Sequence, residues 1–324
     1  MERTAVGIIL NGVTGRMGYR QHLVRSLLAI REQGGLPARD GSRIWPELTL
    51  VGRNEAKLAE IAARHGLTSY TTDLDAALAD DSHQIYFDAQ VTAQREKAVR
   101  AAIDAGMHVY TEKPLAEGLT GSLELGRLAA AKGIKNGVVQ DKLFLPGLRK
   151  LKRLVDGGFF GRILSVRGEF GYWVFEGDWQ DAQRPSWNYR AEDGGGITAQ
   201  INSSWTVRVY RDELVEFQVD GTHGSAVAGL RECRIQHRGA TPMPVWNPDL
   251  PLTENFRGQW QSVPDNEDFD NGFKVQWEAF LRHVVDDEPF PWDFLAGARG
   301  VQLAEASLLS AREGRRVEIE NITL

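Results

Sequence analysis

The sequence predicts an α/β protein: a doubly wound parallel sheet at the N-terminal end, then an α+β domain with an open, mostly antiparallel sheet. Up to about residue 143, short β-branched runs alternate with helical patterns of about 10 to 15 residues, which is typical of βαβ units. Beyond that point, runs with a period of two and glycine turns between them replace this pattern. We therefore assign residues 1–143 and 144–324 to two domains.

Each element of the first domain has a local signal. A helical pattern from about Arg16 to Gly34 follows the first strand, and Asn54 caps a second helix that Gly66 ends. Another helix ends at Gly106, and a further helix precedes the last strand. The predicted strands are TAVGIIL (4–10), LTLVGR (48–53), IYFDA (85–89), HVYTE (108–112) and NGVVQ (136–140).

The second domain opens with a run that alternates strictly, GRILSVRGEFGYWVF at 161–175. Leu164, Val166 and Phe170 fall on one face and predict contact with a core, while Arg167 and Glu169 fall on the opposite, polar face. Three more short strands follow, then a long loop. Two helices, at about 272–286 and 297–313, and a short strand RRVEIE close the chain.

Composition limits the functional classes. The chain has 324 residues, 42% hydrophobic and 25% charged, as in soluble globular proteins. Its net charge of −6 argues against a nucleic-acid partner, and no apolar run reaches membrane-spanning length. A single cysteine, Cys233, excludes an intrachain disulfide and reads as a buried small side chain. We find no metal-ligand spacing, and none of the seven histidines has an acidic partner at an informative spacing. We expect a cytoplasmic protein.

A glycine-rich turn, NGVTGRMG, joins the first strand to the first helix. Gly12, Gly15 and Gly18 allow a tight turn and close approach of a pyrophosphate to the helix N-terminus, whose free N–H groups favour anions. The spacing is GxxGxxG, with Thr14 where a middle glycine is usual. In this strand–turn–helix setting the motif predicts a dinucleotide-binding Rossmann domain rather than a plain structural turn.

The end of the second strand bears on the choice of cofactor. An acidic residue usually stands there to bind the ribose hydroxyl of NAD, but this chain has Gly52, followed by Arg53 and Asn54. A guanidinium at that place suits the 2′-phosphate of NADP, so we favour NADP(H) over NAD(H). The alternative is a solvated arginine at a helix start.

The block AGMHVYTEKPLA, with the glycine turn before it and GGFFGRILSVRGEF after it, resembles the Gfo/Idh/MocA oxidoreductases over nearly the whole chain. The resemblance implies hydride transfer between a nicotinamide and a hydroxyl or keto carbon of a sugar, inositol or related polyol. It implies that Lys113 contacts the reacting oxygen, that Glu112 lies beside the nicotinamide ribose, and that the second sheet packs in a homodimer or homotetramer. The expected cofactor-binding residues are Gly12, Thr14, Gly15, Arg16, Met17, Arg53, Asn54, Gln90, Glu112 and Lys113.

The chain departs from the family at several positions. Arg95 stands where relatives often have a histidine, and Lys142 could be either a second cation near the substrate or a solvated residue. Trp187 and Tyr189 are candidates for substrate binding, since aromatic residues can stack on sugars, although packing is the alternative.

The stretch GGGITAQINSSW departs furthest. In the family such a glycine triplet introduces a helix with an aspartate and, four residues later, a histidine that serves as the acid–base residue. Here those positions hold Gln200 and Ser204, in a segment with strand character. We infer that a segment is missing between Gly196 and Ile197: either the protein lost it, or the sequence joins two ends that it separates, in which case their Cα atoms would be far apart. A catalytically silent NAD(P)-binding sensor and a redox-cycling sugar lyase or glycosidase are therefore alternatives to a dehydrogenase.

Overall fold

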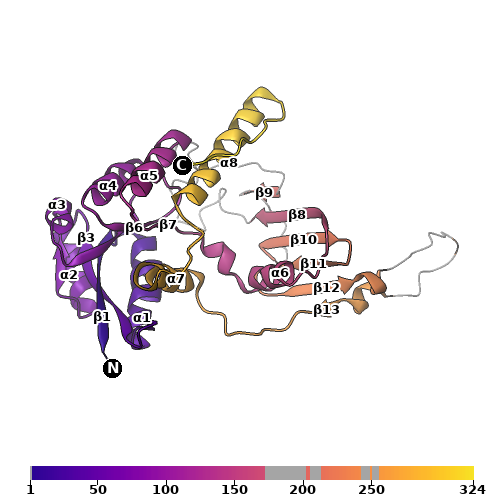
Figure 1. The fold of residues 1–324 in the computed structure, drawn as a ribbon, viewed down its shortest axis with the longest axis horizontal. Coiled ribbons are helices and arrows are strands. Elements are labelled where there is room, and N and C mark those ends of the chain that lie inside the picture. The colour runs from indigo at the N-terminus through magenta and orange to yellow at the C-terminus, as the bar shows by residue number, and fades with distance from the viewer. Residues whose placement is uncertain (1, 172–201, 205–212, 242–248, 250–254) are drawn as a thin grey trace. The chain divides into compact units, whose positions relative to one another are not determined.

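The computed structural model describes residues 2–171, 202–204, 213–241, 249 and 255–324 (Figure 1). The described residues form two compact units. One contains the residues up to Asp141 together with those from Asp270 onward, and the other contains those between Lys142 and Phe269. The chain passes from the first unit to the second between Asp141 and Lys142, and the last 55 residues group with the N-terminal part.

The first unit is built on a parallel sheet, as predicted. Its strand order is β2-β3-β1-β5-β6-β7, and β4 also pairs with β3. The pairs are parallel except for β2 with β3. The strands are β1 (Arg3–Asn11), β2 (Leu36–Pro37), β3 (Arg43–Val51), β4 (Ser69–Thr71), β5 (His83–Asp88), β6 (His108–Thr111) and β7 (Asn136–Val138).

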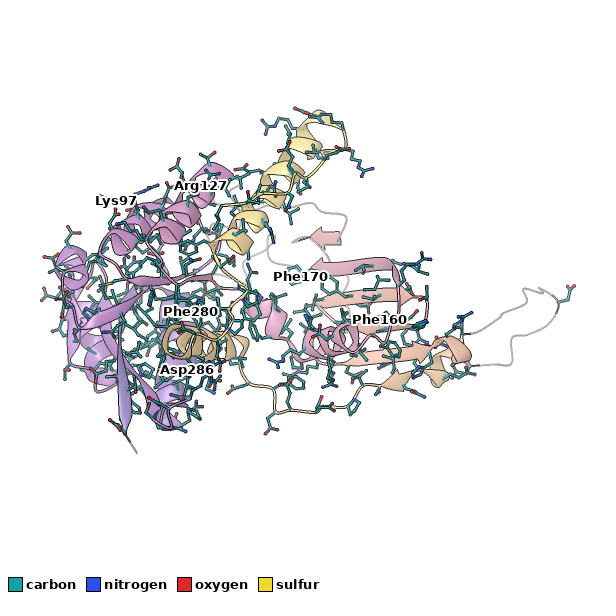
Figure 2. The ribbon with its side chains drawn as sticks, in the orientation of Figure 1. Lys97, Arg127, Phe160, Phe170, Phe280 and Asp286 are labelled. Atoms are coloured by element: carbon teal, nitrogen blue, oxygen red, sulfur yellow. The ribbon has the colours of Figure 1, made fainter. Side chains whose placement is uncertain are left out.

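Helices cover both faces of this sheet. One apolar core contains side chains from η1 (Gly18–Leu28), α1 (Ala29–Glu32), α2 (Glu55–Arg64) and α7 (Gly272–Asp286). The other contains side chains from α3 (Leu74–Leu78), α4 (Thr92–Asp104), α5 (Leu119–Ala131) and the start of α8 (Phe294–Glu313). Figure 2 shows Phe280 of α7 inside the first core, while Lys97 of α4 and Arg127 of α5 lie outside. The sheet is therefore doubly wound.

The first helix differs from the prediction of a regular helix over Arg16–Gly34. Residues Gly18–Leu28 form a π-helix, and Ala29–Glu32 continues it as an α-helix. The hydroxyl of Ser26 donates to the carbonyl of Gln21, five residues earlier, at 2.7 Å. π-Helices are rare, so a helical pattern in a sequence predicts an α-helix by default. π-Helical segments are frequent at functional sites.

The helix α7 belongs to the first unit because its apolar side packs there. Trp277, Phe280 and Leu281 are fully buried in the core that also contains Leu23 and Leu27 of η1. In Figure 1 this helix, from the far end of the chain, lies among the elements of the N-terminal part. The sequence predicts the helix and its apolar face, but not which sheet that face covers.

The starts of α7 and α8 follow local sequence signals. Asn271 caps α7 and Asp293 caps α8 through side-chain hydrogen bonds to backbone N–H groups.

The predicted closing strand RRVEIE is wrong. This segment does not pair with any described strand, and the side chain of Gln302 in α8 donates to the carbonyl of Glu320.

The second unit contains a six-stranded sheet in the order β13-β12-β11-β10-β8-β9. Its described pairs are antiparallel except for β8 with β9, which confirms the mostly antiparallel sheet. The elements are η2 (Asp141–Phe144), α6 (Pro146–Asp156), β8 (Ile163–Gly171), β9 (Asn202–Ser204), β10 (Val215–Gly221), β11 (Gly224–Ala228), β12 (Cys233–His237), η5 (Arg238–Ala240), η6 (Phe256–Gln259) and β13 (Gln261–Ser262).

One face of this sheet is covered by α6. Leucines of α6 pack on a core that includes Val219 and Cys233, so the cysteine is buried as expected. The helix contacts β11 and β12. Leu164 and Val166 of β8 were expected on a core but are 60% and 62% exposed, because α6 lies over the other strands. Among the described residues, no helix is apolar and long enough to span a membrane.

Candidate functional site

The predicted cofactor residues converge on one edge of the first sheet. Strands β3, β1, β5 and β6 are neighbours and parallel, so their carboxyl ends meet at the same edge, which is where ligands bind in open α/β sheets. Each strand is followed directly by candidates: Gly12, Thr14, Gly15, Arg16 and Met17 after β1, Arg53 and Asn54 after β3, Gln90 after β5, and Glu112 and Lys113 after β6.

The glycine turn after β1 packs tightly against the loop after β5. Gly12 has φ +82°, and a Cβ there would lie 2.7 Å from the carbonyl carbon of Ala89. A Cβ on Gly18 would lie 2.7 Å from the carbonyl oxygen of Gly12. At both positions only glycine fits without moving the backbone. The turn leads into η1, whose N-cap residue Met17 makes no side-chain capping hydrogen bond.

The end of β3 has room for a Cβ at position 52. A Cβ on Gly52 would lie 3.4 Å from the methyl group of Thr14 and 3.5 Å from Leu58, which is ordinary contact. Packing therefore does not require glycine here. Arg53 is exposed, and the side-chain oxygen of Asn54 accepts a hydrogen bond from the N–H of Lys57 at 3.0 Å. Since that oxygen caps α2, the amide nitrogen of Asn54 is the group left to meet a ligand.

A buried polar network lies behind the edge, on the α4 side of the sheet. The amide of Asn11 donates to the hydroxyl of Tyr86 at 2.8 Å, and that hydroxyl donates to Asp88 at 2.8 Å. The other oxygen of Asp88 accepts from the N–H of Gln90 at 3.0 Å and from Nε of Arg95 at 3.1 Å. Burial raises the pKa of Asp88, and the guanidinium of Arg95 opposes that rise. The network ties the ends of β1 and β5 to α4.

Arg95 also joins two loops of the edge. Its terminal nitrogens donate to the carbonyl of Gln90, at 2.6 Å, and to the carbonyl of Pro114. One guanidinium therefore connects the segment after β5 with the Glu-Lys-Pro segment after β6. An arginine can reach all three acceptors because its five N–H groups form a fixed fork.

A second buried network lies on the opposite face, around Glu112. Its Oε1 lies 2.9 Å from Nε2 of His22, and its Oε2 accepts from the backbone N–H of Lys113 at 3.2 Å. Nε1 of Trp277 donates to Nδ1 of His22 at 3.0 Å. Burial acts to raise the pKa of Glu112, but the hydrogen bond from His22 and the nearby charges of Lys113 and Arg95 outweigh it and lower the pKa. Glu112 is thus an anion at neutral pH.

The sequence missed His22 and Trp277. His22 appeared to lack an acidic partner, whereas the structure pairs it with Glu112, 90 residues away. The separation is the reason, because neither residue has a local signal for the other. His83 also has an acidic neighbour, Asp80, at 4.0 Å.

The edge has features that a dinucleotide would need. The first turn of η1 contains no acidic residue and Met17 makes no side-chain capping hydrogen bond, so no side chain there repels an anion or takes its place. Within the described part of the chain, the buried Oε1 of Gln90 has no hydrogen-bond partner, although the polar network fixes the backbone around it. Buried amide oxygens rarely lack partners, so a donor from a ligand fits this position. The residues present therefore fit a nicotinamide dinucleotide.

Only some of the predicted catalytic and substrate-binding residues lie in the described part of the chain. Lys113 is exposed, directly after β6, and Lys142 is an exposed residue of η2 that belongs to the other unit. Trp187, Tyr189 and the junction of Gly196 with Ile197 lie outside the described residues. No group of His, Cys, Asp and Glu in the described ranges could hold a metal ion.

Comparisons with known proteins identify the family of the chain. Residues 12–139 match the GFO_IDH_MocA model, described as an oxidoreductase family with an NAD-binding Rossmann fold. The chain is 51% identical to a D-xylose dehydrogenase of Paenarthrobacter nicotinovorans over 388 residues, covering 100% of both chains. It is 30% identical to a levoglucosan dehydrogenase of Pseudarthrobacter phenanthrenivorans over 160 residues, 47% of this chain and 40% of the relative.

Solved structures show the same fold. A levoglucosan dehydrogenase in complex with NADH and levoglucosan superposes with a TM-score of 0.75 at 17% identity, covering 98% of this chain and 100% of that one. An NAD binding oxidoreductase from Klebsiella pneumoniae gives 0.75 at 18% identity, with the same coverage.

Proposed function

The chain is an oxidoreductase of the Gfo/Idh/MocA family, and from that premise we propose that it is an NAD(P)-dependent dehydrogenase acting on a hydroxyl of a sugar or related polyol. The observation that carries the proposal is the position of Lys113 at the same strand edge as the glycine turn. The identity of 51% to a D-xylose dehydrogenase supports a sugar as the substrate class and makes D-xylose the first to test.

The chain's own groups supply positioning and proton transfer. The bound nicotinamide would accept or return the hydride. The amine of Lys113 can take a proton from the sugar hydroxyl, and its ammonium can return one to the keto oxygen. The carboxylate of Glu112 holds the backbone N–H of Lys113 at 3.2 Å and so fixes where that side chain starts. The glycine turn and Gln90 would hold the dinucleotide.

For the cofactor we propose NADP(H) in preference to NAD(H). Gly52 stands where NAD-binding domains carry an acid, although the space would accept one, and the exposed Arg53 follows it. A guanidinium forms charge-assisted hydrogen bonds with a phosphate. The family description names NAD, so the measurement is kcat/KM with both cofactors.

The proposed function is tested with a substrate panel of D-xylose, other sugars, and inositol, each with NAD and NADP. We expect steady formation of reduced cofactor with at least one sugar. Cofactor binding without turnover would contradict the proposal and indicate a sensor. Turnover of sugar without net reduction would contradict it as well, and would indicate a redox-cycling lyase or glycosidase.

We further propose that this chain lacks the family's acid–base helix between Gly196 and Ile197, so that proton transfer falls to Lys113. The alignment with the D-xylose dehydrogenase supports a gap somewhere, because it extends over 388 residues and this chain has 324. Insertion of the relative's corresponding segment at this junction should raise kcat and leave cofactor affinity unchanged. An insertion that folds but does not raise kcat would argue against the missing helix.

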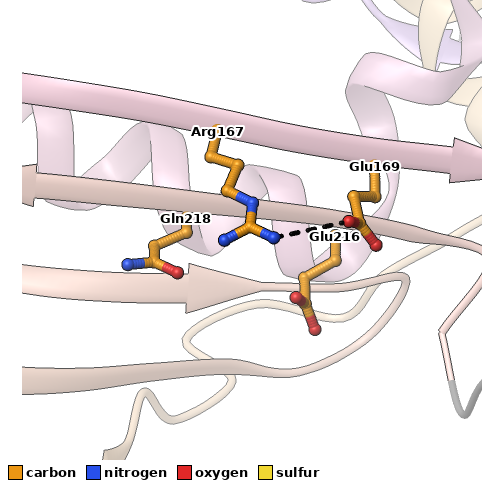
Figure 3. A pocket seen from close by; sticks show the side chains of 4 residues that line it. All are labelled: Arg167, Glu169, Glu216 and Gln218. Carbon is orange, nitrogen blue, oxygen red and sulfur yellow. Dashed lines mark ion pairs between the residues drawn. The ribbon is translucent and has the colours of Figure 1, made fainter. Parts of the chain in front are cut away.

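We also propose that the chain is a homodimer or homotetramer formed through the open face of the second sheet. Figure 3 shows a hollow on that face lined by Arg167 and Glu169 of β8 and by Glu216 and Gln218 of β10. Arg167 and Glu169 approach to 3.7 Å and Arg167 is largely exposed. A surface with both signs of charge can pair with itself about a twofold axis, which supports an interface between identical chains.

A further inference from the structure

His22 lies fully buried in an aromatic cage. Its ring centroid is 4.3 Å from that of Phe87, 5.2 Å from that of Phe273 and 6.3 Å from that of Trp277. Both ring nitrogens have partners, Glu112 for Nε2 and Trp277 for Nδ1. The histidine is therefore held in one orientation by residues from η1, β5, α7 and the loop after β6.

The partner at Nδ1 decides the tautomer. An indole N–H is only a donor, so Nδ1 of His22 must be the acceptor in their 3.0 Å hydrogen bond and carries no proton. The single ring proton is then on Nε2, from which it is donated to Glu112 at 2.9 Å. A second proton would have to occupy Nδ1, where it would meet the indole N–H. His22 is consequently neutral, and its contact with Glu112 is a hydrogen bond to an anion.

The carboxylate that receives this proton joins His22 to the reacting lysine. One oxygen of Glu112 accepts from His22, and the other accepts from the backbone N–H of Lys113. The two hydrogen bonds together fix the rotation of the carboxylate. The groups that face it are Lys113 itself, Arg95 of α4 and Tyr110 of β6, whereas Phe87, Phe273 and Trp277 add no charge around the imidazole.

We propose that His22 and Trp277 are positioning residues of the active site. Trp277 holds His22 in its neutral Nε2–H tautomer, and His22 in turn fixes the ionised Glu112 that carries the backbone of Lys113. A helix from the C-terminal end of the chain thereby controls the charge and orientation of the Glu-Lys-Pro segment. This inference rests on the proposed role of Lys113 and adds two residues that act only through Glu112.

The direct test replaces Trp277 with phenylalanine, which keeps an aromatic ring but removes the donor. Nδ1 of His22 then has no donor facing it and is free to take a second proton in acid. A protonated His22 would form an ion pair with Glu112 in place of the present hydrogen bond. Because the amine of Lys113 must be unprotonated to accept a proton, the wild-type protein already has an acid limb in log kcat/KM against pH, and we expect Trp277→Phe to steepen that limb by a second proton.

The variant His22→Gln tests whether position 22 acts by holding Glu112 or by changing its own charge. The amide of glutamine can donate a hydrogen bond to Glu112 but does not titrate. We expect His22→Gln to keep activity within about threefold of wild type, and His22→Leu to lose about 10- to 100-fold in kcat, as for a lost hydrogen bond to a charged group. The double variant His22→Gln/Trp277→Phe should lose the added steepness and return to the wild-type slope. His83→Gln is the matched control, since His83 is also largely buried and hydrogen-bonded, to Thr49 at 2.8 Å, but at the start of β5.

Two results would overturn the inference. One is a steepened acid limb that persists in the double variant, and the other is a His22→Leu protein with wild-type kcat. Lys113→Ala distinguishes these from failure of the proposed function. If Lys113→Ala is inactive while His22→Leu is unaffected, only the positioning role fails; if Lys113→Ala is fully active, the proposed role of the lysine fails.

Discussion

Asp88 and Arg95 form a buried ion pair, with Oδ1 and Nε 3.1 Å apart and side chains that are 0% and 3% exposed. The pair does not stand alone, since Tyr86 and the N–H of Gln90 also donate to the same carboxylate. Breaking such a pair leaves a charge in the interior, which is costly, whereas replacing both partners can be nearly neutral. The pair therefore allows a clear test of how the edge is held.

We predict that Arg95→Met destabilises the protein by about 3 to 5 kcal/mol, because Asp88 remains buried without its cation. The KM for the cofactor should rise, since Gln90 and Pro114 lose the guanidinium that joins their loops. Urea unfolding and steady-state kinetics measure the two effects. Adding Asp88→Asn should recover part of the stability. Arg100→Met, which removes a partly exposed pair with Glu124 from the same helix, is the control and should cost no more than about 1 kcal/mol.

We predict that Gly52→Asp changes the cofactor preference towards NAD. A carboxylate at the end of β3 can accept from the ribose hydroxyl of NAD and repels the 2′-phosphate of NADP. The ratio of kcat/KM for NADP to that for NAD should fall at least about tenfold, as expected for about 1.4 kcal/mol. Gly52→Ala controls for the added Cβ, which meets only ordinary contacts, and should leave the ratio unchanged. A ratio that Gly52→Asp does not alter would speak against ribose binding at this position.

We predict a pH-dependent stability difference between the wild type and Glu112→Gln. The folded-state pKa of Glu112 is lowered below the ordinary 4.5, so its contribution is fully present above pH 4.5 and is lost as pH falls below that value. The difference in free energy of unfolding should be largest near neutral pH and shrink steadily below pH 4.5. Glu124→Gln, at a half-exposed carboxylate, should show little difference at any pH. A constant difference for Glu112→Gln would mean that its charge is not what matters.

We predict that Arg167→Glu weakens the assembly of the chain. The substitution places a third carboxylate beside Glu169 and Glu216 on the open sheet face, so that like charges would meet in an interface. Sedimentation velocity should show a smaller species than the wild type. Lys152→Glu, on an exposed position of α6, is the matched charge reversal and should leave the size unchanged. An unchanged wild-type size with Arg167→Glu would place the interface elsewhere.

The local signals of the sequence were sufficient for much of the fold. Asn54 caps α2 as predicted, and Gly66 and Gly106 have the positive φ that ends their helices. The glycine turn and the Glu-Lys-Pro segment identified the edge, because the carboxyl ends of parallel strands lie together whatever their distance in the chain. These features depend on backbone preferences within a few residues.

Features that depend on tertiary packing were not predictable. The sequence carries no local signal for the π-helical form of η1. The packing of α7 against the first sheet depends on the shape of the core in which Trp277 is buried. Glu112, the partner of His22, is 90 residues away in the sequence. One partner of Arg95 is the backbone carbonyl of Pro114, 19 residues away, and a backbone carbonyl carries no sequence signal. The two networks behind the edge therefore appear only in the folded chain.

The role of Lys113 is the central claim and is most directly tested by the kcat of Lys113→Ala with D-xylose, or with the best sugar of the panel, at saturating cofactor. We predict a loss of about 10² to 10⁴-fold, the usual contribution of a general acid–base group. Lys97→Ala, an exposed lysine of α4, is the control (Figure 2). A wild-type kcat in Lys113→Ala would contradict the assignment of this lysine to proton transfer.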